Sequence, residues 1–379
     1  MRVLYAVCSL GLGHATRSLP LIKALIERGE ELYILSYGPA LNLLKKELGN
    51  EVKEYIEFPD YPPLERGWGK HDFYLILFKD LIKTASIIFQ ERLKTREIVK
   101  KYRIDRIISD GRYGVFSLSV PSFLISHQLR FMVDFFMELI KIGGELANGI
   151  HFLNFRKILV PDYSKYEESL SGDLSHNLRF IPKKKVEYIG ILSSYKKMDI
   201  PEDIDYLFVI SGYIQDKKGS LIMTLREQAK ALPGKKVFLL GDPSEERMVY
   251  DDVHNITLYT YVSGEKRIEL INRARFIISR SGYTTIMDLT ELEKRALFIP
   301  TPGMSEQMYL GKFHKERGTF YSTSQDKVNL IEDLKEAEGY PGIKGREKTS
   351  HSVKKFLDII YKEYKPYNPL EYLRKWPFS

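Results

Sequence analysis

The sequence predicts an α/β protein built from two doubly wound parallel sheets. Three observations support this prediction. Short apolar runs alternate with segments of helical spacing in the first half of the chain. The second half repeats the alternation, and a polar stretch that includes three lysines at 183–185 separates the two halves. The chain has 379 residues, which is enough for two domains of ordinary size.

The elements follow in chain order. Residues 3–8 form a continuous apolar run, which is typical of a strand buried on both faces, and residues 15–28 continue with helical spacing. Further strands of the first half are predicted at 32–37, 52–58, 106–110, 122–127 and 157–161, with a long helix over 73–101. In the second half we predict strands at 206–211, 237–241, 255–259, 276–279 and 296–300, and a last helix at 350–364. We divide the chain into a first domain (1–185), a linker (186–200), a second domain (201–349) and a C-terminal helix with its tail (350–379).

Composition limits the classes of partner and compartment. The formal net charge of +8 favours an anionic partner or, equally, a solvated lysine and glutamate surface. The single cysteine, Cys8, lies in an apolar run and is expected to be buried, and a lone cysteine fits a reducing compartment. No run approaches the roughly 18 apolar residues of a membrane span, and the N-terminus does not resemble a signal peptide. We therefore expect a cytoplasmic protein.

The first strand leads directly into a glycine loop that contains Gly11 and Gly13. Such a turn between strand and helix lets the backbone approach a ligand at the helix N-terminus. The loop differs from the dinucleotide-binding fingerprint in two ways. Thr16 occupies the position of the third glycine, and the second strand does not end in an acidic residue. His14 at the loop tip is either a general base or a helix cap, and Asp110 is either its partner from a neighbouring strand or a turn residue.

A second pair of loops is predicted within residues 276–318. This segment has the order strand, glycine turn, helix, strand, proline-glycine loop, helix, so both loops lie at the carboxyl edge of one parallel sheet. Each leads into a helix N-terminus, which favours an anion. Asp288 lies inside the first helix, and Glu306 and Gln307 open the second. The arrangement suits a ligand that combines a diphosphate, a ribose and a sugar.

The ordered set Ser281, Gly282, Thr285, Asp288, Pro300, Glu306 and Gln307 resembles the donor-sugar signature of GT-B glycosyltransferases, in particular the MurG-like branch and its UDP-glycosyltransferase relatives. The resemblance implies the GT-B fold, in which two Rossmann-like domains face each other across a cleft and a C-terminal helix crosses back to the first domain. It implies inverting, metal-independent transfer of GlcNAc or another hexose from a UDP-sugar to an acceptor hydroxyl, with no cofactor beyond that substrate. A GT-B-fold UDP-sugar 2-epimerase and a dinucleotide-binding Rossmann protein are the alternatives.

The resemblance also assigns expected roles to residues. On the acceptor side, in the first domain, the expected catalytic pair is His14 with Asp110, accompanied by Gly11, Gly13, Arg17, His127 and Gln128. The expected donor-binding residues of the second domain are Ser211, Gly212, Tyr213, Tyr261, Val262, Ser281, Gly282, Thr284, Thr285, Asp288, Glu306 and Gln307. Gly311 stands where MurG-like enzymes carry Asn.

The acceptor is expected to be lipid-linked or a small molecule. The aromatic and basic stretch 130–156, with Arg130 and Arg156, either rests on an anionic membrane at the cytoplasmic face or packs in the core. The sequence holds no basic helix or module that would predict nucleic-acid binding. It also holds no suitably placed metal motif, so we expect no metal site.

Overall fold

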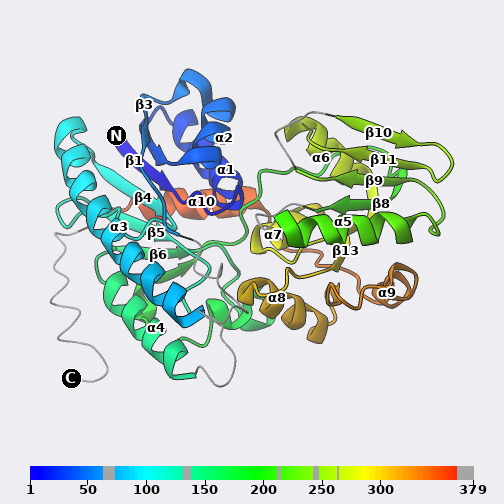
Figure 1. Cartoon of the computed structure of the whole chain (residues 1–379). Coiled ribbons are helices and arrows are strands. Elements are labelled where there is room, and N and C mark those ends of the chain that lie inside the picture. The colour runs from blue at the N-terminus through cyan, green and yellow to red at the C-terminus, as the bar shows by residue number, and fades with distance from the viewer. Residues whose placement is uncertain (63–72, 131–137, 211–214, 242–246, 263, 365–379) are drawn as a thin grey trace. The chain divides into compact units, whose positions relative to one another are not determined.

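The computed structural model describes residues 1–62, 73–130, 138–210, 215–241, 247–262 and 264–364. These residues form two compact units, each built on a seven-stranded sheet (Figure 1). Unit 1 combines residues 1–194 with the described part of 347–379, and unit 2 comprises residues 195–346.

The sheet of unit 1 has the strand order β3-β2-β1-β4-β5-β6-β7, and each neighbouring pair is parallel. Its strands are β1 (Arg2–Val7), β2 (Glu31–Ser36), β3 (Glu54–Glu57), β4 (Arg106–Asp110), β5 (Ser122–Ile125), β6 (Lys157–Val160) and β7 (Val186–Tyr188). The strand order reverses between β1 and β4, and Val7 pairs with Asp110 in their register. Ligands of open α/β sheets bind at such a reversal, beyond the carboxyl ends of the strands.

The helices of unit 1 are α1 (Gly13–Glu27), α2 (Gly38–Leu48), α3 (Phe73–Tyr102), α4 (Glu138–Phe152) and α10 (Thr349–Ile360). The C-terminal helix α10 returns to unit 1 and packs beside α1 (Figure 1). Its first residue, Thr349, accepts a hydrogen bond from the Ser193 backbone N–H at 2.9 Å through Oγ1. This return was expected from the predicted fold class. Residues 365–379, the aromatic tail of the prediction, lie outside the described residues.

One predicted boundary needs correction, because β7 pairs in parallel with β6 and so residues 186–188 belong to the first sheet rather than to the linker. The lysine run before β7 suggested a solvated joint, but Lys185 is fully buried. Its Nζ donates to backbone carbonyls at the end of α4, including that of Leu153 at 3.1 Å. Burial, reinforced by the nearby charges of Arg156 and Lys157, lowers the pKa of Lys185 to about 7.

The sheet of unit 2 has the order β10-β11-β9-β8-β12-β13-β14, and only the pairing of β10 with β11 is antiparallel among the strands described. Its strands are β8 (Ile204–Val209), β9 (Lys236–Leu239), β10 (Met248–Asp251), β11 (Ile256–Tyr259), β12 (Ala274–Ser279), β13 (Arg295–Phe298) and β14 (Tyr321–Ser322). The sequence prediction missed β10 and β14. Both are short edge strands, and neither presents a long apolar run.

The helices of unit 2 are α5 (Gln215–Ala229), α6 (Gly264–Arg273), α7 (Tyr283–Leu292), α8 (Ser305–Glu316) and α9 (Leu330–Ala337). Apolar side chains of α5 and α9 pack together against β8, β9, β12 and β13 in one continuous core. The segments that follow β12 and β13 lead into α7 and α8, so these two helices begin at the carboxyl edge of adjacent parallel strands. That placement was predicted from the sequence.

Candidate active site

The glycine loop of unit 1 places His14 in the first turn of α1. Gly11 has a φ of +90°, a conformation that L side chains rarely adopt, and this allows the chain to turn sharply after β1. The N-cap residue of α1 is Leu12, which has no acceptor for the first N–H groups of the helix. The His14 side chain is 22% exposed, so it is anchored in the unit yet still reaches solvent.

His14 is paired with Asp110. The His14 Nδ1 atom lies 2.8 Å from Oδ1 of Asp110, which ends β4 and is fully buried. This pairing was one of two options left open by the sequence. The adjacent Gly111 has a φ of +72°, and a Cβ atom there would lie 2.9 Å from His14 Cε1. Glycine is therefore needed at position 111 both to form the turn and to leave room for the imidazole ring of His14.

Two further side chains of α1 donate to the same carboxylate. Arg17 donates to it through Nη2 and through Nε, the latter at 2.9 Å from Oδ2, and Ser18 donates its hydroxyl to Oδ2 at 2.8 Å. Burial alone would raise the pKa of Asp110, but the charge and hydrogen bonds of Arg17, with those of His14, hold it below its usual range. Asp110 is thus ionised and acts as an acceptor.

The predicted acceptor-side residues after β5 divide into two kinds. His127 is buried, and its Nδ1 lies 3.0 Å from Arg17 Nη1, so it joins the His14 cluster. Gln128 is half-buried, and its backbone N–H and carbonyl both form local hydrogen bonds with the Ser126 hydroxyl.

A second buried cluster, which sequence analysis missed, supports the glycine loop. Arg112 donates through Nε to Glu91 of α3, and its Nη1 lies 3.2 Å from Asp60 Oδ2. Asp60 accepts the backbone N–H of Ser9, and Glu91 accepts that of Gly114 at 2.8 Å. We call Arg112, Glu91 and Asp60 the buried triad. It connects α3 with the chain on both sides of His14.

In unit 2, the two predicted loops are joined directly. Ser281, which is buried, donates its hydroxyl to the backbone carbonyl of Gln307 at 2.7 Å. The Gln307 side chain in turn accepts the Thr301 backbone N–H at 2.9 Å. The Ser281 hydroxyl therefore joins the two loops to each other. The N-cap residues, Gly282 of α7 and Met304 of α8, make no capping hydrogen bond with a side chain of their own.

The remaining donor-side predictions lie around the same loops. Asp288 is half-buried on α7. Burial and the charge of Asp288 raise the pKa of Tyr195 to about 12, although the charge of Arg267 on α6 acts in the opposite direction. The charges of Asp288 on α7 and Arg267 on α6 thus both act on Tyr195. The half-buried donor-side residues are Tyr261, Val262, Gly282, Thr284, Thr285, Glu306 and Gln307. Ser211, Gly212 and Tyr213 lie outside the described residues.

Two residues of unit 2 add information that the sequence motif did not give. Arg280, just before Ser281, is buried and donates to the carbonyls of Ile299 and Pro300 and to the Gln325 side chain. Burial lowers the pKa of Arg280 to about 10. At Gly311, a Cβ atom would lie 2.7 Å from Ser322 Oγ and 2.8 Å from Pro300 Cγ, so α8 packs too closely on β14 for a side chain.

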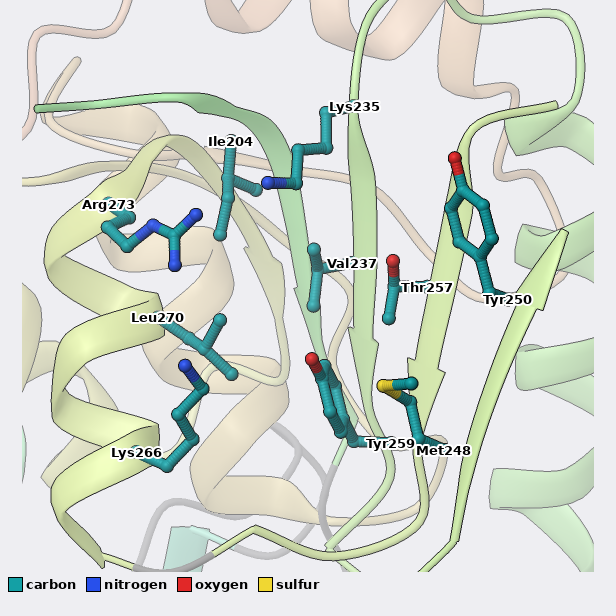
Figure 2. Close-up of a pocket in the computed structure, with 10 residues that line it drawn as sticks. All are labelled: Ile204, Lys235, Val237, Met248, Tyr250, Thr257, Tyr259, Lys266, Leu270 and Arg273. Carbon is teal, nitrogen blue, oxygen red and sulfur yellow. The ribbon is translucent and has the colours of Figure 1, made fainter. Parts of the chain in front are cut away.

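A cavity of about 190 Å³ lies elsewhere in unit 2, between α6 and the face of β8, β9, β11 and β10 (Figure 2). Figure 2 shows Tyr250, Tyr259 and Met248 on one side and Lys266 and Arg273 of α6 on the other. Both cations form ion pairs with Glu269, at 2.9 and 2.8 Å. No predicted site residue lines this cavity, so it is separate from the loops described above.

The residues that the structure describes offer neither a metal-binding cluster nor a membrane-spanning helix. They contain no group of three or more His, Cys, Asp or Glu side chains arranged to hold a metal ion. Within the same ranges, no helix has the length and apolar character needed to cross a membrane.

Comparisons with known proteins agree with this fold and these loops. Residues 224–359 match the glycosyltransferase family 28 C-terminal domain. The chain is 26% identical to an uncharacterized glycosyltransferase of Methanosarcina acetivorans, over 90% of this chain and 91% of that protein. It is 21% identical to the UDP-N-acetylglucosamine–N-acetylmuramyl-(pentapeptide) pyrophosphoryl-undecaprenol N-acetylglucosamine transferase of Natranaerobius thermophilus, over 85% and 86% of the two chains. The crystal structure of Acinetobacter baumannii MurG superposes with a TM-score of 0.58 at 14% identity, covering 96% of this chain and 99% of that one.

The fold is of the GT-B class, and the family 28 match together with the relatives named as glycosyltransferases identifies an enzyme of the glycosyltransferase class. Over most of its length the chain is similar to MurG-like glycosyltransferases, and residues 224–359 carry the match to the family 28 C-terminal domain.

Proposed function

We propose that the protein is an inverting, metal-independent glycosyltransferase that moves GlcNAc or another hexose from a UDP-sugar to an acceptor hydroxyl. The observation that carries the proposal is the 2.8 Å contact between His14 Nδ1 and the ionised carboxylate of Asp110. A carboxylate on one ring nitrogen orients the imidazole and leaves the other nitrogen to take up a proton.

The proposed step is a single displacement. The acceptor oxygen forms a bond to the anomeric carbon on the face opposite the leaving group, and His14 Nε2 takes the hydroxyl proton. The bond between that carbon and the diphosphate oxygen breaks, and UDP leaves with the electron pair. Helix N-termini stabilise developing negative charge on a leaving group. The N-termini of α7 and α8, which begin at the carboxyl edge of adjacent parallel strands, suit that task.

The donor assignment rests on unit 2. Asp288 would hold the ribose hydroxyls, because a carboxylate accepts two hydrogen bonds at once, and Glu306 and Gln307 would contact the transferred sugar. The Natranaerobius relative is named for a UDP-N-acetylglucosamine donor, which supports UDP-GlcNAc as the first donor to test. The hydrogen bond from the Ser281 hydroxyl to the Gln307 carbonyl would set the spacing between the phosphate and sugar subsites.

The same relative is named for an undecaprenol-linked acceptor, and we propose a lipid-linked acceptor for this protein as well. Leu10 and Leu12, on either side of Gly11 in the glycine loop, are both exposed. Exposed apolar side chains beside the proposed base suit an acceptor with a hydrophobic part. Catalysis would then take place in the cytoplasm, at the cytoplasmic face of the membrane.

The membrane contact is proposed for α3 and α4 of unit 1. Gly143, Leu146, Ala147 and Ile150 form an exposed stripe at helical spacing on α4. Ile82, Phe89 and Leu93 are exposed on α3, where Lys79, Lys83 and Arg96 are exposed too. Apolar side chains bordered by basic ones suit an anionic lipid surface.

Two basic residues of the predicted membrane stretch do not belong to this surface. Arg130 is buried and pairs with Glu145 at 2.6 Å, and Arg156 packs over the Tyr364 ring at 4.9 Å. Phe131 to Met137 lie outside the described residues. Both arginines therefore pack against other side chains of unit 1, whereas α4 presents an exposed apolar stripe.

A nucleotide panel tests the donor. Thermal unfolding is measured with UDP, UDP-GlcNAc, UDP-glucose, GDP, dTDP and NAD, because a ligand that binds only the native state raises the melting temperature. We expect a shift with UDP and a larger shift with one UDP-sugar. A shift with NAD alone, or no shift, would contradict the proposal. Conversion of UDP-GlcNAc to its C2 epimer without any acceptor would favour the epimerase alternative.

The His14→Ala variant tests the base. We expect its melting temperature to respond to the donor as the wild type does, because the proposed donor residues lie in unit 2. Transfer should fall by about 10²–10⁴-fold, the usual contribution of a general base. Transfer at the wild-type rate would show that another group takes the proton.

A further inference from the structure

Arg17 is the central residue of the acceptor-side cluster. It is 1% exposed, and its guanidinium contacts three ionisable side chains from three separate segments. These are Asp110 at the end of β4, His14 at the start of α1 and His127 after β5. A guanidinium only donates hydrogen bonds, so each contact constrains where its partner carries a proton.

The tautomer of His14 follows from Asp110. An ionised carboxylate only accepts, so the 2.8 Å contact with Oδ1 requires a hydrogen on His14 Nδ1. Arg17 Nη2 also lies 2.9 Å from Nδ1, but it donates to the same Oδ1 atom. Arg17 Nη2 and His14 Nδ1 lie close together because both donate to the same acceptor, Asp110 Oδ1. The lone pair of His14 is therefore on Nε2.

The tautomer of His127 follows from Arg17. Its Nδ1 lies 3.0 Å from Arg17 Nη1, which only donates, so this nitrogen must accept. A neutral His127 then carries its hydrogen on Nε2. A second proton on Nδ1 would face an N–H of the buried guanidinium, so Arg17 opposes protonation of the ring.

The other titratable groups around the cluster do not change this assignment. Burial raises the pKa of Tyr5 on β1 and of Cys8 just after it, and it raises that of Tyr113, after β4, to about 12. All three are neutral near pH 7 and add no charge next to the histidines. Asp110 and Arg17 are the charged side chains that contact the two rings in the hydrogen bonds given above.

We propose that Arg17 is a positioning residue that fixes the tautomer of His127, and that this tautomer is opposite to the one Asp110 fixes on His14. His14 presents a lone pair on Nε2, and His127 presents a hydrogen on Nε2. The functional consequence rests on the proposed function. His14 can take up the acceptor's proton, whereas His127 can only supply a hydrogen bond to an oxygen. The ion pair of Arg17 and Asp110 thereby separates the roles of two chemically identical rings, Asp110 acting on His14 and Arg17 on His127.

The test is an NMR experiment on ¹⁵N-labelled protein without substrate. Two-bond proton–nitrogen correlations distinguish the Nδ1–H and Nε2–H tautomers of each histidine ring. The signals of the two rings are assigned with the variants His14→Gln and His127→Gln. At neutral pH we expect Nδ1–H on His14 and Nε2–H on His127. The same tautomer on both rings of the wild type would overturn the proposal.

Variants locate the cause. In Arg17→Met, His127 should lose its fixed tautomer and should gain a second proton as the pH is lowered, while His14 keeps Nδ1–H through Asp110. Ser18→Ala is the control, since it removes another donor to Asp110 without touching either ring, and both tautomers should persist. An unchanged His127 in Arg17→Met would overturn the role of Arg17. If Arg17→Met does not fold, the wild-type assignment alone decides.

Activity is assayed separately. Opposite tautomers in a protein that transfers no sugar would leave the inference standing and refute the proposed function. If both rings carry the same tautomer in a protein that does transfer sugar, the inference is refuted and the proposed function stands.

Discussion

Asp110 shows how one residue combines stability with function. It is fully buried, it accepts hydrogen bonds from three side chains of α1, and it belongs to the strand that pairs with β1. Asp110→Asn would leave the charge of Arg17 buried without its carboxylate. Removing one member of a buried ion pair costs about 3–5 kcal/mol, so we expect a loss of this size in urea unfolding at pH 7.

The same substitution predicts a pH dependence. Because the folded-state pKa of Asp110 is depressed, the stability it contributes is present above its unfolded pKa of about 3.9. That contribution is lost as the pH falls from about 4 towards the folded-state pKa. The difference in stability between wild type and Asp110→Asn should therefore narrow below about pH 4. A constant difference from pH 7 to pH 3 would show that the carboxylate charge is not responsible.

The close approach of Gly111 to the His14 ring can be tested by adding a single methyl group at position 111. Gly111→Ala places a Cβ atom 2.9 Å from His14 Cε1, at a φ of +72°. We expect a stability loss of about 1–2 kcal/mol from the left-handed backbone, and a fall in kcat because the ring must move. Gly29→Ala is the matched control, since Gly29 has a φ of +77° and open space around its Cβ position. It should lose similar stability and keep its kcat, and equal kcat losses in both variants would contradict the role given to the ring contact.

At the scale of elements, the buried triad joins α3 to the glycine loop. Burial raises the pKa of Glu91, while Arg112 and the donors Tyr61 and Gly114 oppose that rise. Glu91→Gln would remove one of the two carboxylates that balance Arg112, and we expect a loss of about 3 kcal/mol in urea unfolding. The control is Glu97→Gln on the same helix, where an exposed pair with Lys94 should contribute at most about 1 kcal/mol. Equal losses would mean that the triad does not stabilise unit 1.

The elements also show how far sequence reasoning reached. The central strands were predicted to within a few residues, because parallel strands buried on both faces present continuous apolar runs, and so were the helices α1, α3 and α10. The contact between His14 and Asp110 was foreseeable, since both lie at the carboxyl edge of one sheet. The buried triad was not, because Glu91 lies in a helix rich in lysine and arginine, where a carboxylate is usually solvated. The position of Ser281 was predicted, but its contact with Gln307 depends on how two adjacent loops fold.

The family pattern is also altered for a physical reason. Gly311 replaces the Asn expected from the MurG-like pattern, and the sequence alone suggested only a lost sugar contact. The structure gives a packing reason, because Ser322 and Pro300 fill the space of a side chain. Any sugar contact that Asn would make at this position must here come from another residue, and Glu306 in the first turn of the same helix is a candidate.

At the scale of the whole molecule, a net charge of +8 accompanies an exposed apolar surface on α3 and α4. Both helices contact Phe116, since Arg92 of α3 lies 4.0 Å above its ring and His151 of α4 meets it at 5.9 Å. Their exposed side chains thus belong to neighbouring parts of unit 1. Apolar burial gives affinity for a membrane, and basic residues add attraction to anionic lipid that salt weakens.

This combination predicts salt-sensitive binding of the full chain to vesicles that contain anionic lipid. Phe89, 65% exposed on α3, and Ile150, 53% exposed on α4, would insert into the lipid, so Phe89→Asp and Ile150→Asp should each weaken co-flotation several-fold. Met223→Asp is the control, because Met223 is 75% exposed on α5 of unit 2, outside the proposed surface. Each variant should keep the wild-type melting temperature, since these side chains are largely solvated. Wild-type flotation by both α3 and α4 variants, or equal loss in Met223→Asp, would show that α3 and α4 are not the membrane contact.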